Sequence, residues 1–301
     1  MDKIRIISTP QALRAYIDEL HSRGVDSLAF DLEADQGSYR YRYSVSIFQC
    51  FDGNDAVVVD ALALAASGDC LRELLEAPDI VKVMFSSKND LFITQNVLGF
   101  GISPIRDIAV AQKILGLQVN LSAHLGIEKA AKDTFQRANW LKRPISPDLL
   151  AYAVGDVELL LKIEADLRAV LAERKLLDRY KETCAALPRS DYRVDQYRQY
   201  ENKFPGYPRL GPEKKELARL LWIFRELVGE YFDTPVGYII STKALPDLIQ
   251  KGPEALAARL IFELNKGRRT GRRIELVFVE DILSKARGVI SAGLSAPGFR
   301  P

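Results

Sequence analysis

Residues 27–34, SLAFDLEA, alternate apolar and polar side chains in the manner of a half-buried strand. Successive side chains of a strand point to opposite faces, so Asp31 and Glu33 share one face. Phe30 and Leu32 share the other. An acid inside a strand is disfavoured unless it has a partner. The pattern therefore predicts a strand that presents two carboxylates from a rigid element, although a solvated pair of acids stays open as the alternative from this motif alone.

Further strands and helices are predicted on both sides of this strand. Residues 52–55, DGND, form a turn signal between two apolar runs and predict an antiparallel hairpin. A hairpin argues against a purely parallel, doubly wound sheet and favours an α/β fold with a mixed sheet, in the layout of ribonuclease H-like domains. Strands are expected at residues 4–8, 44–51, 56–62 and 81–86, and helices at 9–24, 69–77, 88–99 and 107–116.

Two further acids and a tyrosine stand in helical settings. Asp90 lies near the start of the helix expected at 88–99. Tyr152 and Asp156 are four residues apart on a later helix, so they share one face of it. Each has a plainer interpretation. Asp90 could only stabilise the positive end of its helix, and Asp156 could lie on a solvated face with Tyr152 in the core.

The combination of these acids suggests phosphodiester hydrolysis. This reaction needs an activated water and a stabilised leaving oxygen, and two divalent metal ions roughly 3.5–4 Å apart supply both. Mg²⁺ and Mn²⁺ prefer oxygen ligands, above all carboxylates. The strand would provide two ligands on one face, and Asp90 and Asp156 would close the site from helices. Tyr152 would lie beside a metal ligand, where it could orient the attacking water.

Composition argues against several other classes of protein. The chain has 301 residues, 48% hydrophobic and 27% charged, with a net charge of +2, as in ordinary globular proteins. Its 3 cysteines are far apart and it has 2 histidines, so we expect no disulfide framework, zinc site or histidine-based relay. The first residues include acids, and no stretch approaches the roughly 18 apolar residues of a membrane span. We therefore expect a cytoplasmic protein.

Several motifs, taken in order, resemble those of the DEDD superfamily of 3′→5′ exonucleases, in particular ribonuclease D-like members of the tyrosine subclass. The resemblance covers roughly the first 180 residues. Departures from the family pattern, such as Phe85 where histidine is common, concern substrate choice and rate rather than the metal ligands. The matching segments are FDLEAD at 30–35, IFQCF at 47–51, KVMFSSKNDLFI at 82–93 and QRANWLKRPISPDLLAYAVGDVELLLKI at 136–163.

The resemblance implies both a site and a reaction. Asp31, Glu33 and Asp156 would hold two divalent metal ions, Mg²⁺ or Mn²⁺, directly. Asp90 would act mainly through a metal-bound water, and Tyr152 would position the nucleophilic water. The implied activity is a metal-dependent 3′→5′ exoribonuclease that releases nucleoside 5′-monophosphates and trims RNA 3′ ends, tRNA precursors included. The alternatives are a 3′→5′ DNA exonuclease in repair and a non-catalytic nucleic-acid binding protein on the same fold.

The expected partner is the single-stranded 3′ end of RNA, or else of DNA, with no membrane or protein partner. Arg40 and Arg42 alternate with tyrosines after the first motif and could grip such an end, or simply form the approach to a hairpin. Leu32 and Asn89 adjoin motif acids and are further candidate contacts. A basic cluster could contact phosphates or be a solvated loop; its members are Arg268, Arg269, Arg272 and Arg273.

The chain is expected to contain two domains, since a typical domain has roughly 100–200 residues. The exonuclease domain is predicted at residues 1–180. A Pro-, Gly- and Tyr-rich linker follows at 181–211. Residues 212–292 are expected to form a small helical domain that resembles the HRDC domain, the module that follows the nuclease in ribonuclease D. Residues 293–301 are expected to be a disordered tail.

Overall fold

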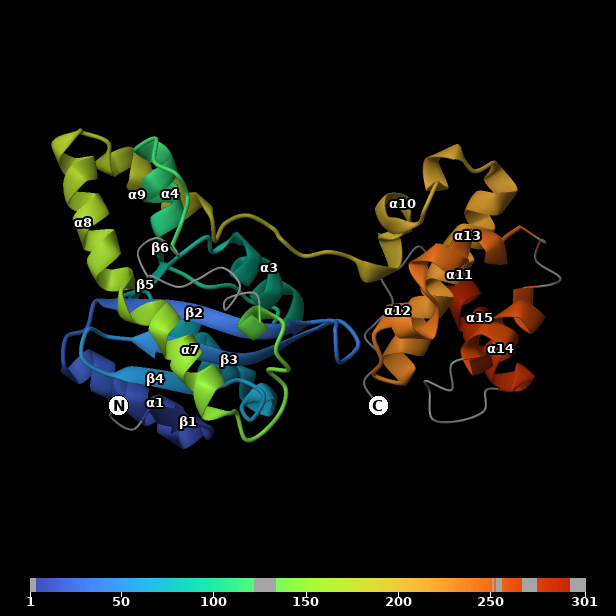
Figure 1. Ribbon diagram of the computed structural model, residues 1–301, viewed down its shortest axis with the longest axis horizontal. Coiled ribbons are helices and arrows are strands. Elements are labelled where there is room, and N and C mark those ends of the chain that lie inside the picture. The colour runs from blue at the N-terminus through green and yellow to red at the C-terminus, as the bar shows by residue number, and fades with distance from the viewer. Residues whose placement is uncertain (1–3, 122–133, 251, 253–255, 267–274, 293–301) are drawn as a thin grey trace. The chain divides into compact units, whose positions relative to one another are not determined.

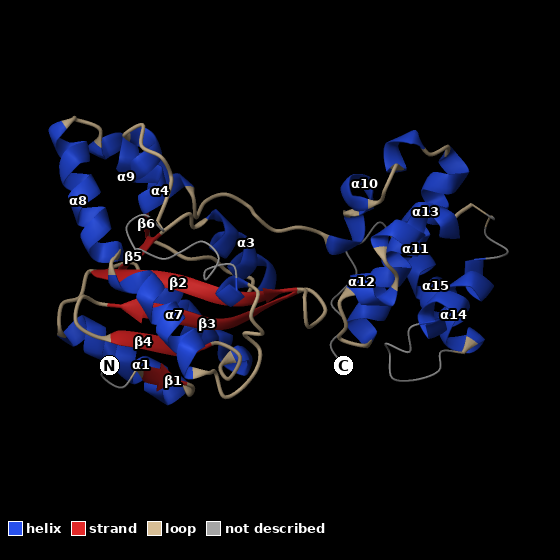
Figure 2. Ribbon diagram, viewed as in Figure 1, coloured by secondary structure: helices blue, strands red, loops and turns tan. Residues whose placement is uncertain are grey.

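The computed structural model describes residues 4–121, 134–250, 252, 256–266 and 275–292 (Figures 1 and 2). The chain divides into two compact units, the first made of Met1–Gln36 and Tyr43–Arg193 and the second of Gly37–Arg42 and Val194–Pro301. Within the described residues, none of the helices combines the length and the apolar character that crossing a bilayer requires.

A mixed six-stranded sheet forms the centre of the first unit (red in Figure 2). Its strands are β1 (Arg5–Ile7), β2 (Ser27–Gln36), β3 (Tyr43–Phe51), β4 (Ala56–Asp60), β5 (Val81–Met84) and β6 (Ile105–Asp107). Their order is β1-β4-β3-β2-β5-β6; β2 and β4 run antiparallel to β3, and the other pairs are parallel. The mixed sheet is thereby confirmed. In the turn after β3, Asp52 accepts hydrogen bonds from the amides of Asn54 and Asp55 at 2.9 and 2.8 Å.

Helices cover both faces of this sheet. They are α1 (Pro10–Ser22), α2 (Gly68–Leu75), α3 (Lys88–Val97), α4 (Ile108–Ile114), α7 (Pro147–Glu158), α8 (Leu160–Glu173) and α9 (Leu177–Ala186). The helices α1, α2 and α3 bury one face, in a core that includes Phe30, Leu32 and Phe48. On the other face α7 lies across β2, β3 and β4 (Figure 1), and α8 covers β2 and β5. The site-bearing strand β2 is therefore enclosed on both sides.

Two helices begin at a side-chain cap. Thr9 accepts a hydrogen bond from the amide of Ala12 at 3.2 Å, and a proline follows it in the first turn of α1. Ser146 accepts one from the amide of Leu149 at 3.4 Å at the start of α7. The side-chain oxygen satisfies an amide that the helix itself leaves unpaired. The start of α7 is thus fixed locally, and this decides which of its residues face the sheet.

The second unit is helical, as expected for the C-terminal region. Its helices are α10 (Tyr200–Lys203), α11 (Pro212–Tyr231), α12 (Val236–Ile239), α13 (Leu245–Leu248), α14 (Leu256–Lys266) and α15 (Leu276–Ser291). The linker predicted at 181–211 is wrong, because α9 extends to residue 186 in the first unit. Tyr197, Tyr200 and Phe204 are then buried in the core of the second unit. The tyrosines that suggested a linker are core residues, and the predicted tail at 293–301 lies outside the described residues.

Residues 37–42, which join β2 to β3, belong to the second unit. The Tyr41 hydroxyl donates to the Glu226 carboxylate at 3.0 Å. The Tyr41 ring also lies against Gly229 of α11, where a Cβ would come within 2.9 Å of the ring and 2.8 Å of the Val236 side chain. Only glycine fits such a close approach. This loop is therefore part of the core contacts of the helical unit.

Candidate active site

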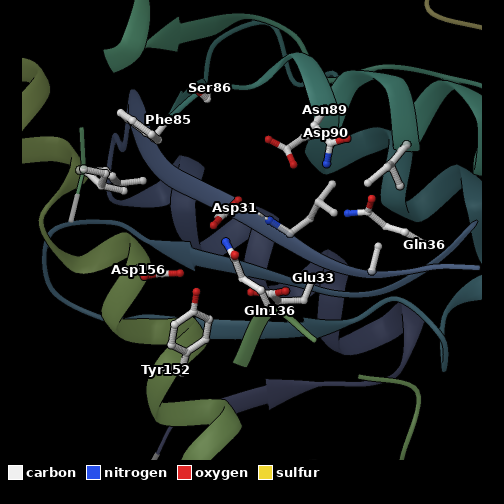
Figure 3. Close-up of a pocket in the computed structure, with 15 residues that line it drawn as sticks. Asp31, Glu33, Gln36, Phe85, Ser86, Asn89, Asp90, Gln136, Tyr152 and Asp156 are labelled. Carbon is white, nitrogen blue, oxygen red and sulfur yellow. Dashed lines mark hydrogen bonds between the residues drawn. The ribbon is translucent and has the colours of Figure 1, made fainter. Parts of the chain in front are cut away.

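One cavity in the first unit brings together the residues predicted to carry chemistry. Its volume is about 380 Å³, and Figure 3 shows the side chains that line it. All five predicted catalytic residues are among them: Asp31, Glu33, Asp90, Tyr152 and Asp156. They come from β2, α3 and α7, so three elements that are distant in the sequence form one site.

The strand β2 holds two acids on the face that α7 covers. Phe30 and Leu32 are buried in the core on the opposite face, whereas Asp31 and Glu33 are half-buried and line the cavity. The amide of Leu32 donates to Asp31 Oδ1 at 2.9 Å, which orients this carboxylate. The pairing with β3 shifts register between Glu33 and Ala34. Such irregularities re-aim side chains beside active sites, and this one follows the second acid directly.

The helix α7 places Tyr152 and Asp156 one turn apart against the sheet. Both are buried, with 8% and 5% of their surfaces exposed. The ring of Phe135 stacks on Tyr152 with centroids 4.8 Å apart. Burial, and then the neighbouring carboxylates of Asp156, Glu33 and Asp31, raise the pKa of the Tyr152 phenol. The phenol therefore keeps its proton and serves as a hydrogen-bond donor, with Asp156 as its acceptor.

An arginine fixes the segment that leads into α7. Arg143 donates two hydrogen bonds to the Asp60 carboxylate at the end of β4, at 2.7 and 2.8 Å. It also donates to the carbonyl of Trp140 at 2.7 Å, and the Ser46 hydroxyl donates to the same carbonyl at 2.5 Å. Burial raises the pKa of Asp60, but the hydrogen bonds and charge of Arg143, together with the amides of Ala63 and Leu62, outweigh burial and hold this pKa below its ordinary value. Arg143 lies in the segment at 136–163 that resembles the family, and these hydrogen bonds give it a positioning role.

Asp90 enters the cavity from the first turn of α3. It is 8% exposed, and burial, followed by the charges of Asp31 and Asp107, raises its pKa well above the ordinary value. Asp107 caps α4 by accepting from the amide of Ala109 at 2.8 Å. It also accepts from the amide and hydroxyl of Ser87 at 2.9 and 2.8 Å. The same carboxylate thus ties the start of α3 to the start of α4 and sets the position of Asp90.

The chemistry of the cavity fits hard divalent cations. Its candidate metal ligands are carboxylates, and no lysine or arginine is among the described residues that line it. Burial, and then the charges of Asp31 and Asp107, raise the pKa of Asp90 in this cavity. Within the described chain, no group of three or more His, Cys, Asp or Glu side chains is arranged to hold a single ion. A two-ion site does not require one, because it divides the carboxylates between the ions, and substrate and water oxygens complete each shell.

The predicted nucleic-acid contacts occupy different places. Leu32 and Asn89 line the cavity. Arg40 instead forms an ion pair within the second unit, and the guanidinium of Arg42 lies 4.8 Å from the centre of the Tyr41 ring. A role for these two arginines in gripping RNA stays a prediction. Outside the described residues lie Arg268, Arg269, Arg272 and Arg273.

Two glutamines near the carboxylates were not assigned a role from the sequence. Gln136 lines the cavity, and Figure 3 shows it reaching into the space beside Asp31 and Glu33. Gln49 is fully buried on β3, where it pairs with Asp31, and its amide has no hydrogen-bond partner among the described residues. A polar residue within an apolar strand is a signal that could have drawn attention to Gln49. Gln136 carries no comparable signal.

Comparison with known proteins places this site in a family. The chain matches a protein family described as 3′-5′ exonuclease over residues 4–172, more than half of its 301 residues. The chain belongs to this family. Ribonuclease D of Haemophilus influenzae, a relative, is 25% identical over 262 residues, which cover 83% of this chain and 63% of that protein. Exosome complex exonuclease RRP6 of Saccharomyces cerevisiae is 27% identical, over 82% of this chain and 36% of that protein. The chain thus spans less than two thirds of the length of either relative.

Solved structures of RRP6 and RNase D from other organisms have a similar fold. The catalytic core of RRP6 from Trypanosoma brucei has a TM-score of 0.74 at 20% identity, over 97% of this chain and 81% of that one. Escherichia coli RNase D has a TM-score of 0.72 at 18% identity, over 99% and 79%. At these identities the likeness concerns the fold. Together with the family match, it confirms the ribonuclease D-like identification drawn from the motifs and the mixed-sheet fold with a helical C-terminal region.

Proposed function

We propose that this chain is a metal-dependent 3′→5′ exoribonuclease that removes nucleotides one at a time and releases nucleoside 5′-monophosphates. The observation that carries the proposal is the single cavity that four carboxylates and Tyr152 line together, in a chain of the 3′-5′ exonuclease family. RNA is favoured over DNA because the relatives named above are a ribonuclease and an exosome exonuclease. The substrate would be a single-stranded RNA 3′ end, as in the trimming of tRNA precursors.

The cofactors would be two divalent metal ions, Mg²⁺ or Mn²⁺. Asp31, Glu33 and Asp156 are the residues that would hold them, and Asp90 would act from the outer shell. When bound, such ions lower the pKa of water and stabilise charge on the leaving oxygen. The cavity supports this proposal because its buried carboxylates have no cationic neighbour among the described lining residues.

The protein's own groups would position the reactants. The Tyr152 phenol keeps its proton, so once its hydrogen bond to Asp156 is released it can donate one instead to an oxygen of the attacking water or of the scissile phosphate. It would orient this oxygen and would not remove a proton from it. Asn89 offers an amide at the edge of the same cavity, which suits the base or sugar of the terminal nucleotide. Leu32 would contribute through its backbone, because its side chain is buried in the core.

A gel assay tests this proposal. A 5′-labelled single-stranded RNA and its DNA counterpart are incubated with Mn²⁺, Mg²⁺ or EDTA, beside the Asp156→Ala variant. We expect a metal-dependent ladder that shortens from the 3′ end, is stronger on RNA and is absent in the variant. A stronger ladder on DNA would move the chain to the DNA exonuclease alternative. Binding without any product would contradict the catalytic proposal.

A further inference from the structure

A second cavity of the first unit lies apart from the catalytic one. Its volume is about 350 Å³, and it shares no described lining residue with the catalytic cavity. It is formed where β5 and β6 begin and by residues of α8, α9 and the segment after α9. Val81, which lines it, pairs with Ser27 of β2, four residues before Asp31. That separation is roughly 13 Å along the strand. The second cavity thus lies toward the opposite end of β2 from the carboxylates.

The second cavity is lined by cations. Its basic side chains are Arg106, Arg168, Lys181 and Arg189. None of the described residues that line it is an aspartate or a glutamate. Within the described chain, Lys181 and Arg189 also have no acidic partner at ion-pair distance. Like charges gathered around one cavity repel one another, and a bound anion would remove that repulsion.

A buried carboxylate holds two of these arginines from behind. Glu164 lies 3.9 Å from Arg106 and 3.4 Å from Arg168, and its side chain is 3% exposed. The Arg168 Nε is the atom that faces Glu164 at 3.4 Å; this contact lacks hydrogen-bond geometry, and the atom has no other partner among the described residues. Four cations against this one carboxylate leave an excess of three positive charges. Glu164 therefore orients the arginines and leaves their hydrogen-bonding capacity only partly used.

A neighbouring cavity does not share this excess of basic over acidic side chains. That third cavity, of about 360 Å³, also includes Arg106 and Arg168. Its other charged lining residues are Arg23, Asp26, Asp52 and Glu164. Acids and bases are therefore equal in number there, three of each. The second cavity differs from the third in having no acid among its described lining residues.

Most of the other residues that line the second cavity are apolar or aromatic. Pro104, Ile105, Tyr180 and Pro188 contribute to its walls. Arginine and lysine side chains bind phosphate oxygens through charge-assisted hydrogen bonds. Apolar and aromatic surface beside them suits a base or a ribose. A phosphate joined to a nucleoside presents both kinds of surface, and its size suits a cavity of this volume.

We propose that this second cavity binds the phosphate group of a nucleotide at a place separate from the site of hydrolysis. The same chemistry is offered by two sources, a free nucleoside 5′-monophosphate and the phosphodiester backbone of a single-stranded RNA. The cavity holds its ligand through Lys181 and Arg189, with Arg106 and Arg168 fixed by Glu164. The proposal goes beyond the proposed hydrolysis, because it requires neither a metal ion nor a cleaved bond.

The test measures binding in the absence of hydrolysis, on the full chain in EDTA. Without cations the carboxylates of the catalytic cavity repel phosphate, so binding there is suppressed. Adenosine 5′-monophosphate and a short single-stranded RNA are titrated calorimetrically against the unaltered protein and the double variant Lys181→Ala/Arg189→Ala. The matched control is Arg14→Ala/Arg72→Ala, which removes two arginines whose side chains are 58% and 53% exposed on α1 and α2. Acetylation of Lys181 is followed by mass spectrometry with and without each ligand.

We expect the Lys181→Ala/Arg189→Ala variant to bind at least one ligand about 10-fold more weakly, with the control variant unchanged. The same ligand should slow acetylation of Lys181 in the unaltered protein. An effect confined to RNA identifies the backbone as the source, and an effect on the mononucleotide identifies the free nucleotide. Unchanged affinity for both ligands, with Lys181 acetylated at the same rate in their presence, would overturn the proposal. Failure of the gel assay would leave this result intact, because no hydrolysis enters it.

Discussion

Tyr152 is the residue whose chemical role the fold restricts most closely. Burial and three carboxylates keep its phenol protonated. The substitution Tyr152→Phe keeps the ring and its stacking on Phe135 but removes the hydroxyl. We expect kcat to fall on the order of 10²–10³-fold while Mn²⁺ binding persists. Single-turnover hydrolysis and calorimetric titration of Mn²⁺ measure the two effects. The pH–rate profile should keep its shape, so loss of one limb in the variant would show that the phenol titrates.

Asp90 is held in a way that costs stability in the absence of cations. Its pKa is raised by burial and then by Asp31 and Asp107. The folded chain therefore holds a proton at pH values where the unfolded chain has lost it. The stability contributed by Asp90 is complete below the unfolded pKa of 3.8 and falls as the pH rises toward the folded pKa. The buried acid thus favours cation binding and lowers the stability of the folded chain without cations.

The substitution Asp90→Asn should accordingly stabilise the metal-free protein while impairing hydrolysis. At pH 7 in EDTA we expect a gain of about 1–3 kcal/mol, or a few degrees in Tm, because a buried charge is removed. Thermal melts at pH 4 and pH 7 are the measurement, and the gain should be smaller at pH 4, where Asp90 of the unaltered chain is protonated and both proteins have a neutral side chain at this position. Equal gains at the two pH values would mean that charge is not the cause.

At the scale of elements, the position of α7 depends on the pair between Arg143 and Asp60. The pKa of Asp60 is held below 3.8, so its contribution to stability is present above this unfolded value and is lost as the pH falls through the folded one. We expect Asp60→Asn to cost roughly 2 kcal/mol at pH 7 and to slow hydrolysis. The difference in Tm should narrow below about pH 4. Asp55→Asn, in an exposed turn, is the control; a cost that persists unchanged in acid would argue against the ion pair.

The elements that carry the site could be predicted because their signals are local. The alternation around Asp31 and Glu33 gives the strand and its acidic face, and the cap at Ser146 gives the start of α7. The spacing between Tyr152 and Asp156 then places both on one side of that helix. Three motifs in family order supplied what local pattern lacks, namely that elements distant in the sequence converge.

Other elements could not be predicted because tertiary contacts decide them. Lys82 lies in the middle of β5 and is fully buried, with its ammonium donating to the carbonyls of Ala77, Ile80 and Ser103 at 2.9, 2.9 and 2.7 Å. A lysine in an apolar run suggests an exposed face, and only these acceptors reverse that. The short strand β6 was not predicted. It ends at Asp107, the residue that caps α4, so the sequence pattern at this point indicates only the start of a helix. The second cavity, with its basic lining, forms where several elements pack together, so no single segment of the sequence predicts it.

At the scale of the whole molecule, catalysis and the helical unit are separable in one respect. Every described residue that lines the catalytic cavity belongs to the first unit. The loop at 37–42 is the exception to a clean division, because Tyr41 is built into the second unit through Glu226 and Gly229. Removing residues 194–301 would therefore expose an aromatic side chain but would remove none of the described residues that line the cavity.

A chain that ends at Arg193 and carries Tyr41→Ser should consequently retain hydrolysis. The serine avoids the exposed aromatic surface that truncation would create. We expect kcat on a short single-stranded RNA within about tenfold of the full chain, because the carboxylates and Tyr152 are all present. Affinity for a longer RNA should fall and depend less on salt, because phosphate contacts outside the cavity are lost. Circular dichroism establishes that the shortened chain is folded, and the gel assay compares the rates. A folded but inactive chain would mean that the helical unit completes the site, and full-strength binding of long RNA would mean that the first unit alone grips the substrate.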